Sequence, residues 1–341
     1  MKQLRIYFLN VGQGDCTYIE CASGERIWRI LIDCNLHPGH GIDVIRFLKD
    51  QIPKVDRKRT LDYVIVTHPH KDHISGLGGL VAFSIGELWD SGHVPEDPDT
   101  DHYKNYEELK EQNEAALKEW KMSRSPVMIC GGEVAAHVFS PSRFIRDDEE
   151  MTETERREAI HEECMVVKLT FGDFSLLLTG DSNRAAWERI AGYEEYGAEV
   201  LASTILHASH HGSRTFFKRD EDDEPYTNAI EMIRPDHLLI SVSDPSPHEH
   251  PHPDAMELYR KYVKEENIWH TSKGTVICVV GEDGSYTIDY EDGSIQERYA
   301  LEEGDDDDGG GGSGKSSRLG GFAAGMNVIS SRTRIDDKPA A

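Results

Sequence analysis

The chain has 341 residues, with 37 Lys and Arg against 63 Asp and Glu, and a formal net charge of −26. Its length is enough to bury a sizeable core, in one large domain or two smaller ones. Because polyanion binding normally needs a basic surface, this charge counts against nucleic-acid or membrane binding by the isolated chain, but not against a local basic groove or a basic partner protein. No run of roughly 18 apolar residues predicts a membrane span.

The first part of the chain predicts short strands, a helix, another strand and a charged helix. The predicted strands are Leu4–Leu9, Thr17–Cys21, Trp28–Ile32 and Leu61–Val66, and the predicted helices are Ile42–Asp50 and Tyr103–Met122. The residues of the second helix that recur at near-helical spacing are Tyr106, Leu109, Asn113, Leu117 and Trp120. Their spacing indicates a packing face.

A charge-dense segment, Arg146–Glu163, interrupts this pattern with four consecutive acidic residues at 147–150. We interpret residues 143–163 as an acidic insert, a solvated loop or helix start at the surface. Strands and helices then alternate, and a closing hairpin turns over Asp283–Gly284. The predicted strands are Met165–Leu169, Phe174–Leu178, Ser203–Leu206, His237–Val242, Gly274–Val280 and Ser285–Tyr290, and the predicted helices are Trp187–Ile190, Asn228–Ile233 and Asp254–Lys264.

The composition changes sharply at Gly304, where the run GDDDDGGGGSGKSS begins. Such a segment cannot bury enough apolar surface to fold, so we expect residues 1–300 to form the domain and residues 301–341 a linker and flexible tail. The apolar patch Phe322–Ile329 makes the tail a candidate docking segment, although composition favours a plain unstructured end. The first residues lack a signal-peptide pattern and the six cysteines form no CxxC pair, so we expect a cytoplasmic protein with reduced thiols.

A cluster of ligand-type side chains directly follows the predicted strand Leu61–Val66, in the pattern HxHxDH. Positions two apart face the same way in an extended-to-turn segment, so His68 and His70 can chelate one ion. Asp72 and His73, past the turn, can serve a second. Imidazole with carboxylate suits Zn²⁺, Mn²⁺ or Fe²⁺ better than Ca²⁺ or Mg²⁺. We therefore predict two divalent metal ions per chain, Zn or Mn.

This cluster and two flanking motifs resemble the metallo-β-lactamase superfamily. Leu31–Ile32–Asp33 is similar to the strand-end Asp that orients the metal site in that family, and Thr179–Gly180–Asp181 is similar to its GD motif, whose carboxylate bridges two metals. The resemblance implies an α/β protein with the metallo-β-lactamase fold, an αββα sandwich of two mixed sheets flanked by helices. It also implies a metal-dependent hydrolase.

The same resemblance implies two further histidine ligands. One should precede Asp181 by a pair of strands, where His161 stands; a solvated histidine in a charged loop is the alternative. The other should follow the next strand, in the run Ile205–Ser213. Two adjacent histidines cannot both reach one ion from an extended chain, so we prefer His210 as the ligand. His211 then faces the substrate or supports the ligands from behind, and the reverse assignment stays open.

A narrower similarity is to the metallohydrolase domain of the ComEC family of DNA-uptake competence proteins. That family more often has Asp where His70 stands and Asn where His161 stands, so this chain offers more nitrogen ligands. We expect a free-standing relative without the transporter's membrane segments, to which DNA uptake does not carry over. The motifs that carry the similarity, in order over roughly residues 1–295, are Asn10–Asp15, the GD motif, His210–Ser213, Ile240–Val242, His250–Pro253 and Trp269–Lys273.

Two residues beyond the metal ligands are candidates for contact with the substrate. His250, in an extended run of alternating His and Pro, is a candidate proton donor to the scissile group, and the start of a capped helix is an equally good interpretation. Arg214 is a weaker candidate for a phosphate contact, because a lone Arg is more often a surface charge.

Together these residues predict a two-metal hydrolase, first of all a phosphodiesterase or nuclease that cleaves DNA or RNA through a metal-activated water. The alternatives are a hydrolase of a small phosphodiester, lactone or thioester, and a non-catalytic partner-binding module. A basic channel to the metals would favour nucleic acid, and its absence would favour a small substrate. The predicted metal ligands are His68, His70, Asp72, His73, His161, Asp181 and His210, and the predicted catalytic residues are Asp72, His211 and His250.

Overall fold

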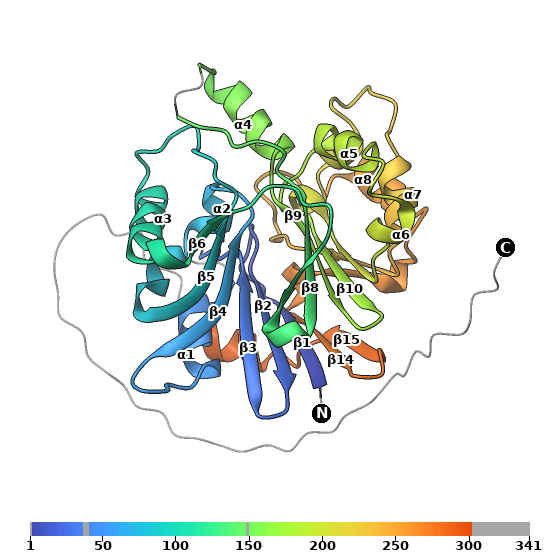
Figure 1. Cartoon of the computed structure of the whole chain (residues 1–341). Coiled ribbons are helices and arrows are strands. Elements are labelled where there is room, and N and C mark those ends of the chain that lie inside the picture. Colours follow the sequence, from blue (N-terminus) through green and yellow to red (C-terminus); the bar gives the residue numbers. More distant parts are fainter. Residues whose placement is uncertain (1, 37–40, 148–149, 302–341) are drawn as a thin grey trace.

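The short apolar runs pair into two mixed sheets in the computed structural model, which describes residues 2–36, 41–147 and 150–301 (Figure 1). The predicted tail, with its candidate docking segment Phe322–Ile329, lies outside the described residues. One sheet has the strand order β15-β14-β1-β2-β3-β4-β5-β6, with β1 Lys2–Phe8, β2 Thr17–Ser23, β3 Arg26–Ile32, β4 Arg59–Val66, β5 Phe83–Asp90, β6 Leu117–Glu119, β14 Val276–Gly281 and β15 Tyr286–Tyr290. The other has the order β13-β12-β11-β10-β9-β8-β7, with β7 Val127–Ile129, β8 Val134–Ser140, β9 Val166–Phe171, β10 Phe174–Leu178, β11 Ile205–His207, β12 His237–Ile240 and β13 Ile268–His270.

Helices flank both sheets, with α1 and α3 on one side of the molecule and α5 to α8 on the other (Figure 1). The α-helices are α1 Val44–Gln51, α2 Lys71–Ile74, α3 Asp101–Gln112, α4 Glu153–Glu162, α5 Arg184–Ala191, α6 Ala198–Leu201, α7 Asn228–Ile233, α8 Pro253–Tyr259 and α9 Ser294–Tyr299. The short 3₁₀ helices are η1 Leu77–Ala82, η2 Glu114–Ala116, η3 Cys130–Gly132, η4 Ser209–Gly212, η5 Arg214–Phe216, η6 Glu265–Asn267 and η7 Thr271–Lys273. None of the helices in the described part of the chain combines the length and apolar character that a membrane crossing requires.

Alternation along the strands divides the core into three layers. In β1, Leu4, Ile6 and Phe8 face the space between the two sheets, whereas Tyr7 faces the helical layer that contains α1. In β10, Leu177 packs against the helices of the opposite side, while its neighbours face inward. Successive strand residues point to opposite faces, so each strand contributes to two layers. The sandwich that the resemblance implied is confirmed.

The predicted helix Tyr103–Met122 is wrong in its second half. Helix α3 ends at Gln112, and Leu117–Glu119 instead forms β6, which pairs in parallel with β5. Trp120 packs against Trp89 of β5, with ring centroids 4.5 Å apart. Sheet pairing and aromatic packing, which depend on distant residues, outweigh the helical spacing of this segment.

The acidic insert contains a helix with a buried face. Its N-terminus is a capping box in which the Thr152 hydroxyl accepts from the Glu155 N–H and the Glu155 carboxylate accepts from the Thr152 N–H. Arg156 and Ile160 of α4 are buried, and the Arg156 guanidinium donates to the Arg146 carbonyl at 2.8 Å. The helix start is confirmed, but the segment is more than a solvated excursion, because its inner face packs against the body.

Strand ends bring the polar motifs to one edge of the sandwich. Strands β3 and β4 are parallel neighbours in one sheet, and β10 and β11 are parallel neighbours in the other. Asp33 follows β3, the HxHxDH motif follows β4, Asp181 closely follows β10, and His210 and His211 follow β11. Since carboxyl ends of parallel strands share an edge, residues far apart in sequence meet there.

Candidate metal centre

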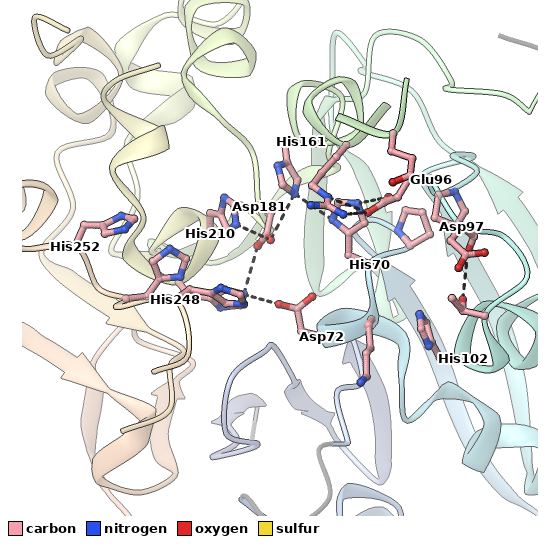
Figure 2. A pocket seen from close by; sticks show the side chains of 18 residues that line it. His70, Asp72, Glu96, Asp97, His102, His161, Asp181, His210, His248 and His252 are labelled. Atoms are coloured by element: carbon pink, nitrogen blue, oxygen red, sulfur yellow. Dashed lines mark hydrogen bonds and ion pairs between the residues drawn. The ribbon is translucent and has the colours of Figure 1, made fainter. Parts of the chain in front are cut away.

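The turn from β4 into α2 and the end of α4 together form a first group of ligand-type side chains. Ligand atoms of His68, His70, His161 and Asp181 all lie within 4.8 Å of one another. Nδ1 of His70 is 3.1 Å from Nε2 of His161, which comes from α4 on the opposite side of the cluster (Figure 2). The structure therefore brings His161 to the motif, as the sequence predicted.

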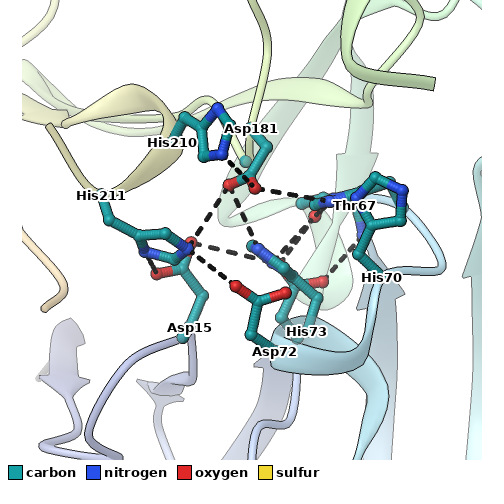
Figure 3. A network of polar contacts seen from close by, with 12 residues as sticks. Asp15, Thr67, His70, Asp72, His73, Asp181, His210 and His211 are labelled. Atoms are coloured by element: carbon teal, nitrogen blue, oxygen red, sulfur yellow. Dashed lines mark hydrogen bonds and ion pairs between the residues drawn. The ribbon is translucent and has the colours of Figure 1, made fainter. Parts of the chain in front are cut away.

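A second group shares Asp181 with the first. It consists of Asp72, His73, Asp181 and His211, again with ligand atoms within 4.8 Å of one another. Nε2 of His73 is 3.1 Å from Oδ1 of Asp181, and Nε2 of His211 is 3.2 Å from Oδ2 of Asp72 (Figure 3). Asp72 and His73 thus serve a different group from His68 and His70, as their positions past the turn predicted.

The two oxygens of Asp181 face different groups. Oδ2 lies 3.6 Å from Nε2 of His68 and 3.9 Å from Nε2 of His161. Oδ1 lies 3.1 Å from Nε2 of His73 and 3.7 Å from Nε2 of His211. One oxygen directed at each group is the arrangement that a carboxylate needs to bridge two ions.

The structure places His211, rather than His210, in the second group. The preference for His210 assumed an extended chain, whereas both residues have left-handed backbones, with φ of 49° at His210 and 55° at His211. This conformation turns both rings inward, so that Nε2 of His210 also reaches Oδ2 of Asp181, at 3.5 Å. The geometry thus favours His211 as the ligand of the second group, with His210 beside it.

Hydrogen bonds on Nδ1 orient two of the rings so that Nε2 faces the cluster. Nδ1 of His73 donates to Oδ2 of Asp33 at 2.7 Å, and Nδ1 of His211 donates to the Ser241 carbonyl at 2.9 Å. In the neutral form of each ring, these bonds place the proton on Nδ1 and leave the lone pair on Nε2, which faces the cluster. Asp33 therefore orients His73, in agreement with the role that the resemblance implied.

Several buried polar atoms at the centre of the cluster lack a partner. Nε2 of His68, Nε2 of His73 and Oδ1 of Asp181 make no hydrogen bond within the described residues. Unpaired buried polar atoms cost free energy, and native proteins rarely tolerate several at one point. Imidazole lone pairs and one shared carboxylate are what divalent ions of the Zn or Mn type bind, so the residues fit such ions.

Comparison with known proteins agrees with this geometry. Residues 9–213, more than half of the chain, match the family model of the metallo-beta-lactamase superfamily. The chain belongs to this superfamily. Similar solved structures include YhfI of Bacillus subtilis (15% identity, 79% of this chain and 96% of that chain, TM-score 0.43), Zn²⁺-bound PqqB of Methylobacterium extorquens (10%, 78% and 97%, TM-score 0.47) and unliganded yeast PDE1 (12%, 79% and 98%, TM-score 0.45). No curated protein sequence matches the chain.

The glycine-rich loop before β2 supports the metallo-β-lactamase site from below. The N–H of Asp15 donates to the Asp72 carbonyl at 3.0 Å, so this loop lies directly under α2. A Cβ on Gly14 would lie 2.3 Å from that carbonyl oxygen, and φ at Gly14 is 133°. Both the space and the backbone conformation therefore require glycine here.

The pKa values of the groups at the centre depend on their burial and on the charged groups close to them. Burial raises the pKa of Asp181, but His210, His73 and His211 outweigh it and hold that pKa well below its usual range. Burial lowers the pKa of His68 well below its usual range, and the neighbouring His73 adds to this effect. Asp181 is thus an ionised carboxylate and His68 a neutral imidazole, which are the states that bind a metal ion.

A pocket of about 840 Å³ opens above the two groups. Its histidine side comes from the loops after β11 and β12, and its carboxylate side comes from α4 and the loop after β5 (Figure 2). Among the described residues, Lys71 and Arg157 are the only Lys or Arg side chains that line it. Arg157 forms an ion pair with Glu96 at 2.7 Å. The described lining is therefore not a basic channel.

The two residues predicted to contact the substrate, His250 and Arg214, have different outcomes. His250 lines the pocket, with its ring centroid 5.4 Å from that of His210, and burial lowers its pKa to about 3. Arg214 is not in the lining and pairs with Asp254 at 3.2 Å, which favours the surface-charge interpretation. His252 accepts the Arg214 N–H on Nδ1 at 3.0 Å, so it also helps to hold this loop.

Sequence reasoning missed Glu96 and Arg157 in the wall of the pocket. Neither belongs to a motif. Glu96 follows β5, the parallel neighbour of β4, and this topology alone places the loop after β5 at the same edge as the metal ligands. Arg157 was inside the segment interpreted as a solvated excursion.

Proposed function

We propose that this chain is a two-metal phosphodiesterase. The observation that carries the proposal is the division of Asp181, with one oxygen towards each of two histidine groups at the floor of an open pocket. In this proposal His68, His70 and His161 would hold one Zn or Mn ion, Asp72, His73 and His211 would hold the other, and Asp181 would be available to both. Ions bound there would supply Lewis acidity and an activated water.

The residues around this floor suit an anionic substrate. Lys71 stands next to the ligand Asp72 and forms no ion pair within the described chain, so its ammonium group is free to contact a phosphate. His250 faces the pocket from the other side, where its imidazole can hydrogen-bond the leaving oxygen. His210, beside Oδ2 of Asp181, can contact a phosphate oxygen.

The similarity to the ComEC metallohydrolase domain favours DNA or RNA as the source of the phosphodiester. The second candidate is a small phosphodiester, because the described pocket contains Glu96, Asp97 and Glu153 and no basic channel. A basic partner protein would reconcile the first candidate with the charge of the chain, and such a partner is part of the proposal for nucleic acid.

The test compares substrates on the metal-loaded protein. Zinc- and manganese-loaded protein is incubated with a chromogenic phosphodiester, labelled single- and double-stranded DNA and RNA, a lactone and a thioester. We expect two ions per chain, phosphodiester hydrolysis that a chelator abolishes, and loss of at least 10²-fold in kcat for Asp181→Asn.

Other outcomes would lead to other conclusions. Hydrolysis of the small diester with DNA and RNA uncut would select the second candidate. Hydrolysis of the lactone or thioester alone would overturn the phosphodiesterase. Two bound ions without any turnover would leave the non-catalytic partner-binding module.

A further inference from the structure

Glu96 stands directly behind one of the proposed metal ligands. Its Oε2 lies 3.2 Å from Nε2 of His70 (Figure 2). Neither atom makes a hydrogen bond to any other described residue, and both are buried. The two atoms are therefore each other's only close polar partner within the described chain.

This contact determines which nitrogen of His70 is available. A carboxylate oxygen only accepts, so the proton of the neutral His70 ring sits on Nε2, towards Glu96. The lone pair is then on Nδ1, which faces Nε2 of His161 at 3.1 Å. Two imidazole nitrogens at this distance, with a lone pair on each, form a chelating pair for one ion. With the opposite tautomer, the Nδ1 proton would point into the site and block it.

A second contact holds Glu96 in place. Its Oε1 accepts from the Arg157 guanidinium, at 2.8 Å from Nε and 2.7 Å from the terminal nitrogen. Arg157 and His161 are four residues apart on α4, so they lie on the same face of that helix. Contacts from His70 through Glu96 to Arg157 thus link one proposed ligand to the helix that carries another, His161.

We propose that Glu96 is a positioning residue for the first metal group: it fixes the tautomer and orientation of His70, and Arg157 anchors it to the helix that supplies His161. The proposal rests on the proposed function, since it assumes that the first group binds an ion. Carboxylates behind metal-bound histidines commonly act in this way, and their loss typically costs 10–100-fold in metal affinity.

The test measures metal binding to the full-length protein by zinc titration against a competing chelator. We expect Glu96→Gln to weaken one of the two zinc equivalents by about 10-fold and Glu96→Ala by up to about 100-fold. The amide oxygen of Gln can still accept from Nε2, whereas Ala removes the acceptor. The other equivalent should stay within about twofold, because its ligands have other partners.

Two further variants make the comparison specific. Glu153→Gln removes the same charge from the same pocket wall but has no contact with a ligand in the described structure, so both equivalents should stay within about twofold of the parent. Arg157→Gln should weaken the same equivalent as Glu96→Gln, by less. It also provides a second variant should the Glu96 variants fail to fold by circular dichroism.

The outcomes separate this proposal from the proposed function. Unchanged binding in both Glu96 variants would overturn it, as would equal weakening of both equivalents or an equal effect of Glu153→Gln. A parent that binds two ions but cleaves no phosphodiester would refute the proposed function and leave the Glu96 comparison valid. A parent that binds no zinc would refute both.

Discussion

The left-handed backbone at His210 and His211 decides which imidazole reaches which oxygen of Asp181. Such φ values are unfavourable for non-glycine residues and cost of order 1 kcal/mol each. They are maintained here because the His210 N–H donates to the carbonyl of Gly180, the glycine of the GD motif, at 3.0 Å. As a result, His210 faces Oδ2 of Asp181 and His211 faces Oδ1, so these two adjacent histidines can take different roles.

Alanine variants should separate the two histidines. We expect His211→Ala to lose one of two zinc equivalents or to weaken it by at least 10-fold, since it removes one of four ligands in the second group. His210→Ala should retain both equivalents and lower phosphodiester turnover, because its ring lies over Asp181 towards the pocket. Zinc stoichiometry by elemental analysis and kcat measure the two effects. Loss of zinc in His210→Ala alone would restore the assignment made from the sequence.

How much of the site the sequence could predict depends on local geometry. The HxHxDH motif defines its own two groups, because strand and turn geometry sets where each side chain points. The choice between His210 and His211 depends on two φ angles, which spacing does not reveal. Glu96 depends on a contact across the pocket with α4, and no local pattern could predict it.

At the scale of elements, His93 connects the loop after β5 to the end of α4. Its Nε2–H donates to the Glu163 carbonyl at 2.8 Å, and its Nδ1 accepts the Ile145 N–H at 3.0 Å. The ring is buried, and this burial lowers its pKa to about 4. A protonated ring would direct a second N–H against the Ile145 N–H, so the connection requires the neutral form.

This connection should make stability depend on pH. In the unfolded chain the imidazole takes up a proton below its ordinary pKa of about 6.5, whereas the folded chain resists until about pH 4. The free energy of unfolding should therefore fall as pH drops from 6.5 to 4, with about 3 kcal/mol at most from His93. Urea unfolding of the metal-free protein measures it. In His93→Gln the free energy of unfolding should fall less steeply with pH, by the slope that the uptake of about one proton on unfolding gives. An identical pH dependence in parent and variant would contradict this role of His93.

Elements with strong local patterns were predictable, and those that depend on distant partners were not. Strands β4, β10 and β11 stand out as apolar runs with polar residues at their carboxyl ends. Strand β6 exists because Leu117 lies opposite Leu88 in the sheet, a pairing that cannot be seen in residues 113–122 alone. The role of α4 likewise emerges only when the body it packs against is present.

At the scale of the whole molecule, the net charge and the lining of the pocket both disfavour a long polyanionic substrate. Residues 1–300 retain −23 of the net charge of −26, because residues 301–341 contain five basic and eight acidic side chains. The pocket offers Lys71 as its one Lys or Arg without an ion pair in the described structure. A long nucleic acid therefore meets general repulsion and few local cations, whereas a small diester meets mainly the local contacts.

Salt should reveal this balance. A nuclease with a basic surface loses affinity steeply as salt rises, with a slope of about −0.9 per phosphate neutralised on duplex DNA. Here few phosphates are neutralised, while raising salt from about 0.01 to 0.15 M shortens the screening length from about 30 to 8 Å and weakens the repulsion. We therefore expect the KM for a long single-stranded DNA to fall over this range, with little change in the KM for a small chromogenic diester. A KM for DNA that rises 10-fold or more with salt would contradict this account, since it would require a basic binding surface that the described pocket does not contain.

Lys71→Ala should raise the KM for both the DNA and the small diester without altering zinc content, because it would remove a phosphate contact that both substrates share.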